Sequence, residues 1–584
     1  MLRFIAAVCF ALVALAAGSA RAENQALAAA VAEYERFDRQ ADPITAGYDG
    51  DRAALRRLPD VSRETELAQR ATLTALRARV QAIDPGQLSD VEAVNRAILL
   101  RLMDNAIAGV DFDQGRMPFG NDDGFFGTGD YLARTTPIQS AEDAEAWLAR
   151  LEALPAYYQQ NVANMRRGIA TRVTQPRIVN ERVLAIIQSQ TETLPETLLS
   201  PFAQLPSSIP AAAQDGYRAR ARALVNERIM PAHRAFVAFF QSEYMPASRR
   251  GIGIRSTPNG AAYYRYLARY HTTTDLTPDQ IHALGEQEVA RIRAEMDQVI
   301  AAAGFHGTFA QFLDMLHGDP RFYVTTPEAL LEKSSEIAKR ADDRLPRLFA
   351  TLPRLPYGVR PVPADVAEGY TTARYWPGSP ALGQAGGLMI NTTHLDQRPL
   401  YELPALILHE GVPGHHLQIA LAQEQGDLPY FRRNASFTAF VEGWGLYAES
   451  LGEDMGMYRT PYERFGRLSM EMWRACRLVA DTGIHWLGWD IERARRCFAE
   501  NSALSAHNIQ TELERYIADP GQALAYKVGE LRFQALRREA AQTLGARFDL
   551  RRFHDEALSA GAIPMDVLDA RMHAWIAAQQ RAAN

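Results

Sequence analysis

The chain has 584 residues, 47% of them hydrophobic and 23% charged, and its formal net charge at pH 7 is −6. This acidic balance, without a long run of Lys or Arg, argues against a nucleic acid or an anionic membrane as a partner. The three cysteines include no C-x-x-C spacing, so a metal site built from thiolates is not supported.

The first 22 residues have the pattern of a secretory signal peptide. Arg3 precedes an apolar core from Phe4 to Ala17, and Ala20-Arg21-Ala22 forms a small-residue cleavage site. The core is too short to span a membrane comfortably, and Cys9 inside it lacks a lipid-attachment context. We predict cleavage after Ala22, a periplasmic or secreted protein if the cell is bacterial, and no stable membrane insertion. A permanent N-terminal anchor is the alternative.

Long amphipathic segments dominate the rest of the chain and predict a mainly helical fold. Several begin at helix-capping residues such as Ser140, Thr277 and Thr326. Pro155 and Pro231 fall inside two segments and predict a kink or a split there. The expected helices are Asn24–Phe37, Glu64–Ala82, Ser89–Asn105, Ala141–Gly168, Ala211–Glu243, Pro278–Ala303, Thr308–His317, Pro327–Leu345, Pro461–Ala480, Ile491–Glu500, Ile509–Asp519 and Gln534–Leu544.

A mature chain of about 560 residues exceeds the usual size of one hydrophobic core. Because no clean linker or internal repeat divides it, we predict one large domain over residues 23–584, with the catalytic part at about 380–530. One β candidate, Gly386–Thr392, precedes the segment with the chemistry. As an edge strand it could pair with an extended peptide, which makes Asn391 a candidate substrate-binding residue. A plain packing strand or loop is the alternative.

The stretch from His409 to His416, HEGVPGHH, is the most informative part of the chain. Zinc proteases carry H-E-x-x-H, in which two histidines one helical turn apart bind zinc and the Glu is the general base. Here Pro413 stands at the position of the second histidine. On a straight helix, His415 would lie roughly 120° off the His409 face and His416 roughly 10 Å further along it. Neither pair would share a metal.

The proline suggests how the motif still works. Pro413 cannot donate a hydrogen bond to the carbonyl of His409, and its ring clashes with that carbonyl. A bulge or break there, helped by the glycines on either side, would swing His415 back toward His409, with Glu410 as the base. His416 is the reserve ligand, and otherwise a group near the substrate or its oxyanion. The competing interpretation is a helix break with surface histidines.

A third ligand is predicted in the helical segment Ser436–Glu449. Glu442 lies among aromatic residues, where a carboxylate is costly unless it is paired or bound to a cation. Gly443 and Gly445 beside it would let another helix or a metal approach closely. We therefore predict a zinc bound by the two histidines and Glu442, with a fourth position open for water. The alternative is an acidic stripe, including Glu449, that faces water.

Motifs spread over nearly the whole mature chain resemble a known bacterial family. They are Leu276-Thr277-Pro278, Leu403–Gln418, Glu442-Gly443-Trp444, Arg474, Arg477-Leu478-Val479, Asp481–His485, Gly488-Trp489, Pro520-Gly521-Gln522, Tyr526–Gly529, Phe553-His554-Asp555 and Gly561–Pro564. This pattern is similar to the "domain of unknown function 885" family of predicted zinc peptidases. That family resembles the large helical zinc oligopeptidases and carboxypeptidases. The resemblance implies a zincin-like helical fold and peptide-bond hydrolysis, without a particular substrate.

Peptide hydrolysis also needs donors for a tetrahedral oxyanion. His485 lies four residues after Asp481, a spacing that lets a carboxylate orient an imidazole. Alone, His485 reads as a buried structural residue, and the resemblance favours a catalytic role. Tyr526 is a second candidate donor, with a plain core tyrosine as the alternative. Lys527 is a third.

Arg474, Arg477 and Lys527 are candidate substrate-binding residues, because a cation can hold a substrate carboxylate and a guanidinium does so bidentately. Such a carboxylate could be a free C-terminus. The alternative is that these cations form structural salt bridges with acids such as Glu471 and Asp481.

We predict a secreted zinc-dependent metallopeptidase with a deep site for oligopeptides or chain ends. A zinc hydrolase of a non-peptide amide, or an inactive periplasmic peptide-binding protein, are the alternatives. Glu410 favours an enzyme, because a binding protein has no need of a base beside the first histidine. Cys476 and Cys497 either form one disulfide or remain two buried thiols.

Overall fold

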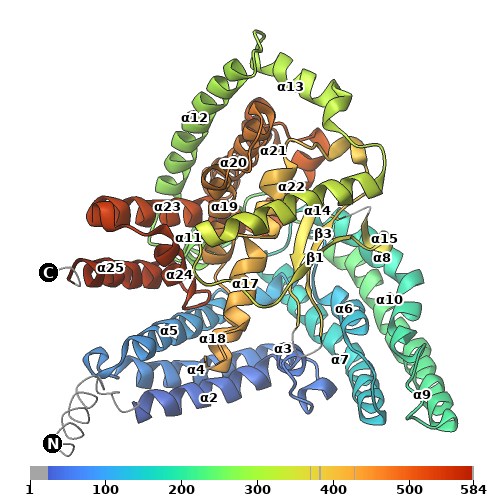
Figure 1. Ribbon diagram of the computed structural model, residues 1–584. Coiled ribbons are helices and arrows are strands. Elements are labelled where there is room, and N and C mark those ends of the chain that lie inside the picture. The colour runs from blue at the N-terminus through green and yellow to red at the C-terminus, as the bar shows by residue number, and fades with distance from the viewer. Residues whose placement is uncertain (1–23, 368–369, 380–382, 427, 582–584) are drawn as a thin grey trace, which may run out of the picture.

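The computed structural model describes residues 24–367, 370–379, 383–426 and 428–581. Helices make up most of these residues, and three strands form one small sheet (Figure 1). The prediction of a mainly helical protein with a small β element is confirmed. The predicted signal peptide and its cleavage site lie outside the described residues. Within those ranges, no helix is long and apolar enough to cross a membrane.

The N-terminal part of the described chain is a set of helices. Three of them, α2, α4 and α5, pack side by side along the bottom of Figure 1. The bounds are α2 (Gln25–Ala41), α3 (Pro43–Tyr48), α4 (Arg63–Gln81), α5 (Asp90–Asp111), α6 (Thr128–Thr135), α7 (Ala141–Thr171), α8 (Arg177–Leu199), α9 (Ala211–Leu224) and α10 (Met230–Phe239). These helices lie apart in sequence from the motif around His409.

The C-terminal part contains the helices that carry the predicted site. Thr277 and Thr326 cap α12 and α14 as expected, each accepting a hydrogen bond from a backbone N–H of the first turn. The bounds are α11 (Gly260–Thr272), α12 (Pro278–Ala302), α13 (Phe309–Gly318), α14 (Pro327–Arg344), α15 (Ala364–Ala367), α16 (Leu403–Glu410), α17 (His415–Gln423), α18 (Tyr430–Asn434), α19 (Thr438–Met455), α20 (Pro461–Thr482), α21 (Ile491–Asn501), α22 (Ala506–Ala518), α23 (Ala525–Leu544), α24 (Leu550–Leu558) and α25 (Met565–Arg581).

The two internal prolines have different outcomes. α7 is a single helix through Pro155, so of the predicted kink or split the split is excluded. The segment predicted over 211–243 is divided near Pro231, because a π-helical turn at Val225–Ile229 separates α9 from α10. A wider turn can accommodate a residue that lacks an N–H.

The sheet contradicts one prediction. β3 (Gly386–Ile390) is the central strand, parallel to β1 (Tyr357–Pro361) and antiparallel to β2 (Ala373–Trp376). It therefore has no free edge for a peptide, contrary to the prediction for residues 386–392. β2 is the outer strand that contacts α16. The position expected for a substrate-pairing strand beside the metal motif thus belongs to β2.

Close helix packing surrounds α16, which contacts α14, α19 and α20. α19 crosses α23 where Gly443 meets Gly529, and a Cβ at either glycine would collide with the other helix. The prediction that small residues beside Glu442 admit another helix is thus confirmed for Gly443. A disulfide joins Cys476 on α20 to Cys497 on α21, which decides between the two alternatives left by the sequence.

Candidate metal centre

The motif around His409 folds as two helices with a break between them. α16 ends at Glu410 and α17 begins at His415, and the residues between them are not helical. Pro413 has no N–H for the preceding turn, so the helix cannot continue regularly through it. A Cβ on Gly414 would collide with the carbonyl oxygen of His409, so this approach requires glycine. The predicted interruption is present as a complete break.

The break brings two histidines to one carboxylate. Oε2 of Glu442 lies 3.5 Å from Nε2 of His409 and 3.5 Å from Nε2 of His415. One ligand atom from each of the three residues lies within 4.8 Å of the other two. Two imidazoles and a carboxylate are a donor set typical of catalytic zinc, and other divalent metals accept the same ligands. The three predicted ligands therefore converge on a point that fits a divalent cation.

Electrostatics at this point favour cation binding. Burial raises the pKa of Glu442, but hydrogen bonds from His409 and His415 outweigh it and hold that pKa well below its usual range. Burial lowers the pKa of His409, but Glu442 and Glu449 raise it to about 9. A cation at this site competes with such protons, so its binding should release protons and weaken as the pH falls.

Glu449 orients the first ligand. Nδ1 of His409 donates a hydrogen bond of 2.8 Å to Oε1 of Glu449, whose side chain is 1% exposed. This bond turns Nε2 of the imidazole toward Glu442, as carboxylates behind metal-binding histidines commonly do. A Cβ on Gly445 would lie 2.8 Å from the His409 ring, so the glycine makes room for it. Glu449 is thus a positioning residue that sequence analysis assigned only to a solvated stripe.

Glu410 is held by the outer strand of the sheet. Its Oε2 accepts a hydrogen bond of 2.8 Å from the backbone N–H of Tyr375 on β2. Its side chain is nearly buried and lines the same cavity as His409 and His415. One carboxylate oxygen is therefore fixed to the strand, and Oε1 remains for a ligand.

A cavity of about 840 Å³ opens beside these residues. Its wall includes residues of β2, of the segment before α16, and of helices α8, α14, α16, α17, α19, α20, α22 and α23. The polar and charged residues of the wall include Arg374, Arg398, Glu402, His409, Glu410, His415, Glu442, Arg474, Arg477, His507, Glu512, Arg515, Gln522 and Tyr526. The volume suits a small or medium-sized ligand.

Tyr526, Arg474 and Arg477 line this cavity, as expected of substrate contacts. Burial and the negative charge of Glu442 raise the pKa of Tyr526, so its phenol stays protonated and can donate a hydrogen bond. Arg474 Nη2 lies 3.3 Å from Glu449, so its charge supports the carboxylate behind His409. Arg474 therefore has a structural partner as well as a place in the wall.

His485 lies elsewhere, and its predicted catalytic role is wrong. Its Nδ1 accepts a hydrogen bond from Ile254 N–H, and its Nε2 donates one to the carbonyl of Tyr516, both at 2.9 Å. Burial lowers its pKa to about 3. Asp481, its expected partner, accepts hydrogen bonds from Tyr264 Oη and Gly521 N–H instead. No ring nitrogen of His485 remains for a substrate.

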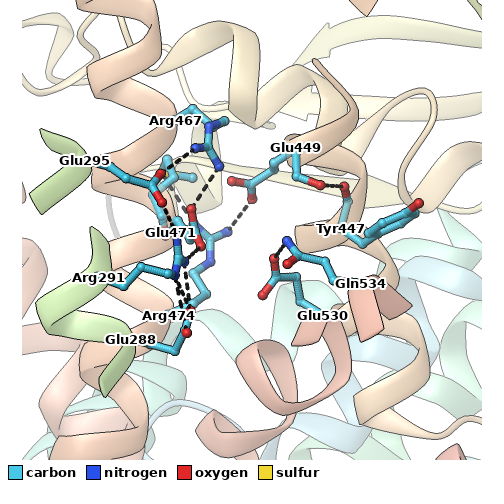
Figure 2. Close-up of polar contacts among 12 residues, drawn as sticks. Glu288, Arg291, Glu295, Tyr447, Glu449, Arg467, Glu471, Arg474, Glu530 and Gln534 are labelled. Atoms are coloured by element: carbon cyan, nitrogen blue, oxygen red, sulfur yellow. Dashed lines mark hydrogen bonds and ion pairs between the residues drawn. The ribbon is translucent and has the colours of Figure 1, made fainter. Parts of the chain in front are cut away.

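Lys527 is also removed from the cavity wall, contrary to the prediction of a substrate contact. Its fully buried ammonium pairs with Glu471 and Glu530 at 2.7 Å and with Glu288 at 3.0 Å. We call these four residues the Lys527 cluster. Figure 2 shows Arg467 paired with Glu471 of this cluster, and Arg474 paired with Glu449. The salt-bridge alternative holds for Lys527.

His416 and Asn391 support the sheet rather than a substrate. Nδ1 of His416 hydrogen-bonds to the hydroxyl of Tyr375 at 2.9 Å, and burial lowers the pKa of His416 to about 4. The side-chain amide of Asn391 donates to the carbonyls of Ala367 and Tyr370. Neither residue is in the cavity wall. His416 instead contacts β2, and Asn391 holds the loop that precedes β2.

Comparison with known proteins gives a family without an assigned activity. The family described as "Bacterial protein of unknown function (DUF885)" matches residues 43–572, and the chain belongs to it, as predicted. The solved structure of "the putative lipoprotein from Colwellia psychrerythraea" is 26% identical, with a TM-score of 0.87 over 94% of this chain and 98% of that one. A "putative lipoprotein of unknown function from Shewanella oneidensis" shares the fold, at 18% identity and a TM-score of 0.73 over 94% and 99% of the two chains. No curated protein matches.

Proposed function

We propose that this protein is an extracytoplasmic, zinc-dependent peptidase that hydrolyses oligopeptides inside the cavity. The observation that carries the proposal is the position of Glu410. It lies in the same cavity wall as the predicted ligands, yet it is tied to β2 and is not one of the three converging donors. A carboxylate fixed beside a metal centre is what general-base hydrolysis requires.

His409, His415 and Glu442 would hold the metal. When bound, zinc supplies Lewis acidity toward a carbonyl oxygen and toward water. Glu449 holds the His409 ring in the orientation that this binding needs. Two carboxylates, Glu410 and Glu442, share the site with imidazoles, so a dication also balances their charge.

Glu410 moves the proton. Because its Oε2 is fixed by Tyr375 N–H, Oε1 takes a proton from the attacking water. The water oxygen bonds to the scissile carbonyl carbon, the C–N bond breaks, and Glu410 returns the proton to the leaving amine. The phenol of Tyr526 donates a hydrogen bond to the developing oxyanion.

The free edge of β2 supports a peptide as substrate. The N–H of Tyr375 points to Glu410, away from β3. Because alternate residues of a strand direct their backbone groups to the same side, the N–H and C=O of Ala373 also point away from β3. Thr372, the residue before Ala373, points the other way and accepts a hydrogen bond from Asn391 N–H, which follows β3. Ala373 and Tyr375 both line the cavity. An extended peptide can add to this edge through main-chain hydrogen bonds, which a general amide would not use.

Three observations support the extracytoplasmic location. The N-terminal 22 residues have the signal pattern. Cys476 and Cys497 form a disulfide, which persists in oxidising compartments. The two structurally similar proteins carry the lipoprotein designation quoted above.

The test compares wild type with Glu410→Gln after loading with zinc. Wild type is expected to hydrolyse unstructured oligopeptides. The variant should keep zinc and fold while losing about 10²–10⁴-fold in kcat, because the amide cannot accept the proton. Zinc content, circular dichroism and mass-spectrometric peptide digestion are the measurements. Near wild-type turnover by Glu410→Gln would refute the mechanism, and a zinc-loaded wild type that cleaves no peptide would refute the proposed activity.

A further inference from the structure

Arg477 presents an unmet hydrogen-bond donor in the cavity wall. The residue lines the cavity on α20 and is 3% exposed. Its Nε donates to Tyr516 Oη at 2.8 Å, and its Nη2 pairs with Glu512 at 3.1 Å. Its Nη1 is buried and has no hydrogen-bond partner among the described residues. A buried donor left unpaired is costly, so this nitrogen is suited to a ligand.

The charge around Arg477 leaves a surplus of one. Arg477 and Arg515 both pair with Glu512, at 3.1 and 3.0 Å. Burial raises the pKa of Glu512, but the two guanidinium charges outweigh it and lower that pKa to about 2. Two cations against one carboxylate leave a single positive charge facing the cavity. A ligand with one negative charge would balance it.

The guanidinium is held flat and close to the metal centre. Its Cζ lies 4.5 Å from the centre of the Trp473 ring and 4.1 Å from that of Tyr526. Tyr526 also feels the charge of Glu442, so this side chain is near both Arg477 and the predicted metal ligand. A planar, oriented guanidinium matches a carboxylate better than a spherical anion does.

Three other cations have carboxylate partners within the protein. Arg474 pairs with Glu449, and Arg182, which also lines the cavity, pairs with Glu514 at 3.5 Å. Lys527 lies in its own cluster outside the wall. Beside Tyr526, the surplus positive charge therefore lies at Arg477 and Arg515. Elsewhere in the wall, Arg398 donates to the carbonyls of Asn391 and Gln397, and Arg374 lies near the ring of Tyr370.

We propose that Arg477, assisted by Tyr526 and Arg515, binds the C-terminal carboxylate of the substrate, so that the enzyme removes a short C-terminal piece of an oligopeptide. This inference rests on the proposed peptidase activity. The carboxylate sits one side chain away from the metal centre, so few residues fit between it and the scissile bond. The main chain on the other side of that bond would lie along β2.

Activity on matched peptides is the first arm of the test. One sequence is offered as the free acid, as the C-terminal amide, and as an amide with Glu as the last residue. The free acid should have a kcat/KM about ten- to a hundredfold above that of the amide, as expected for a charged hydrogen-bonded pair. Arg477→Gln should bring this ratio close to one, mainly through KM. Arg182→Gln removes the same charge elsewhere in the wall and should keep the ratio.

Binding to zinc-loaded Glu410→Gln, measured by calorimetry, is the second arm and needs no turnover. The free acid should bind about ten- to a hundredfold more tightly than the amide. Equal binding or equal cleavage of acid and amide would overturn the C-terminal assignment while leaving a peptidase. Tight binding of the Glu-ending amide would move the assignment to side-chain carboxylates and overturn it as well.

The two proposals can fail separately. If no peptide is cleaved but the free acid still binds preferentially, the carboxylate site stands and the peptidase proposal fails. If Arg477→Gln does not fold, Arg477→Lys keeps the charge but loses the planar fork, and it should lower the ratio in part. In either case, the preference of the wild-type site for the free acid over the amide decides whether the C-terminal assignment holds.

Discussion

Two groups of charged residues lie on neighbouring helices and differ in how their charges are balanced. In the Lys527 cluster, two buried carboxylates and the half-buried Glu288 surround one ammonium at 2.7 to 3.0 Å. In the metal centre, Glu442 meets two imidazoles at 3.5 Å, and Glu410 meets a backbone N–H. Arg291 and Arg467 offset the remaining negative charge of the first group, which lies outside the cavity wall. The carboxylates of the second group are balanced by protons on the histidines or by a bound cation, which is why we propose it as the functional one.

The largest expected effect tests whether the Lys527 cluster is structural. Lys527→Met leaves the buried carboxylate of Glu530 without its cation and takes one of several cations away from Glu471, which should destabilise the fold by about 3–5 kcal/mol. Denaturant unfolding measures the loss. Lys339→Met removes an exposed lysine paired with Asp342 and should change stability by less than about 0.5 kcal/mol. If Lys527→Met had wild-type stability but bound peptides poorly, Lys527 would be a substrate-binding residue and not a structural one.

A smaller effect concerns Glu449, the carboxylate behind His409 in the second group. Glu449→Gln keeps a hydrogen-bond acceptor for His409 but removes the charge, and should weaken zinc affinity about 10–100-fold. Competition with a zinc chelator measures this affinity. Glu453→Gln, on the same helix but paired with Arg464 at the surface, is the matched control and should bind zinc like wild type. An unchanged affinity in Glu449→Gln would show that Glu449 does not position His409.

The smallest effect tests the structural role of His485. Its pKa is about 3 in the folded protein, against 6.5 for an ordinary histidine. As the pH falls below 6.5, the unfolded chain takes up a proton that the folded protein does not, so stability declines. By pH 5 this contribution amounts to about 2 kcal/mol.

Unfolding of wild type and His485→Gln between pH 7 and pH 5 measures that contribution. The variant should lose less stability on acidification. His306→Gln replaces an exposed histidine and should keep the wild-type dependence on pH. An identical pH dependence in all three proteins would contradict a neutral, structural His485.

Local signals predicted much of the site. The break at Pro413 and the approach of His415 follow from residues within one short segment, and Glu442 follows from a carboxylate placed among aromatic residues and glycines. The capping residue Ser140 also marks its helix correctly. Here the chemistry of each residue restricts its own neighbourhood, so no long-range information is needed.

Contacts between residues far apart in the sequence could not be predicted from such local signals. Lys527 meets Glu471 across 56 residues, and nothing near either residue specifies that contact. β3 reads as a strand, but whether it is central depends on β1 and on the short β2. In the structure, buried and exposed residues alternate along β2, as is typical of a strand with one face in the core. α8 was missed although Val179, Val183 and Ile187 recur at helical spacing.

The adjacent histidines His415 and His416 provide the most direct test of the metal centre. Zinc content and zinc-edge X-ray absorption are measured for wild type, His415→Gln and His416→Gln after identical loading. We predict about one zinc per chain in wild type, with nitrogen and oxygen ligands at roughly 2.0–2.2 Å. His416→Gln should retain that zinc, and His415→Gln should lose most of it. Loss of zinc in His416→Gln with retention in His415→Gln, or no stoichiometric zinc in wild type, would contradict the site described here.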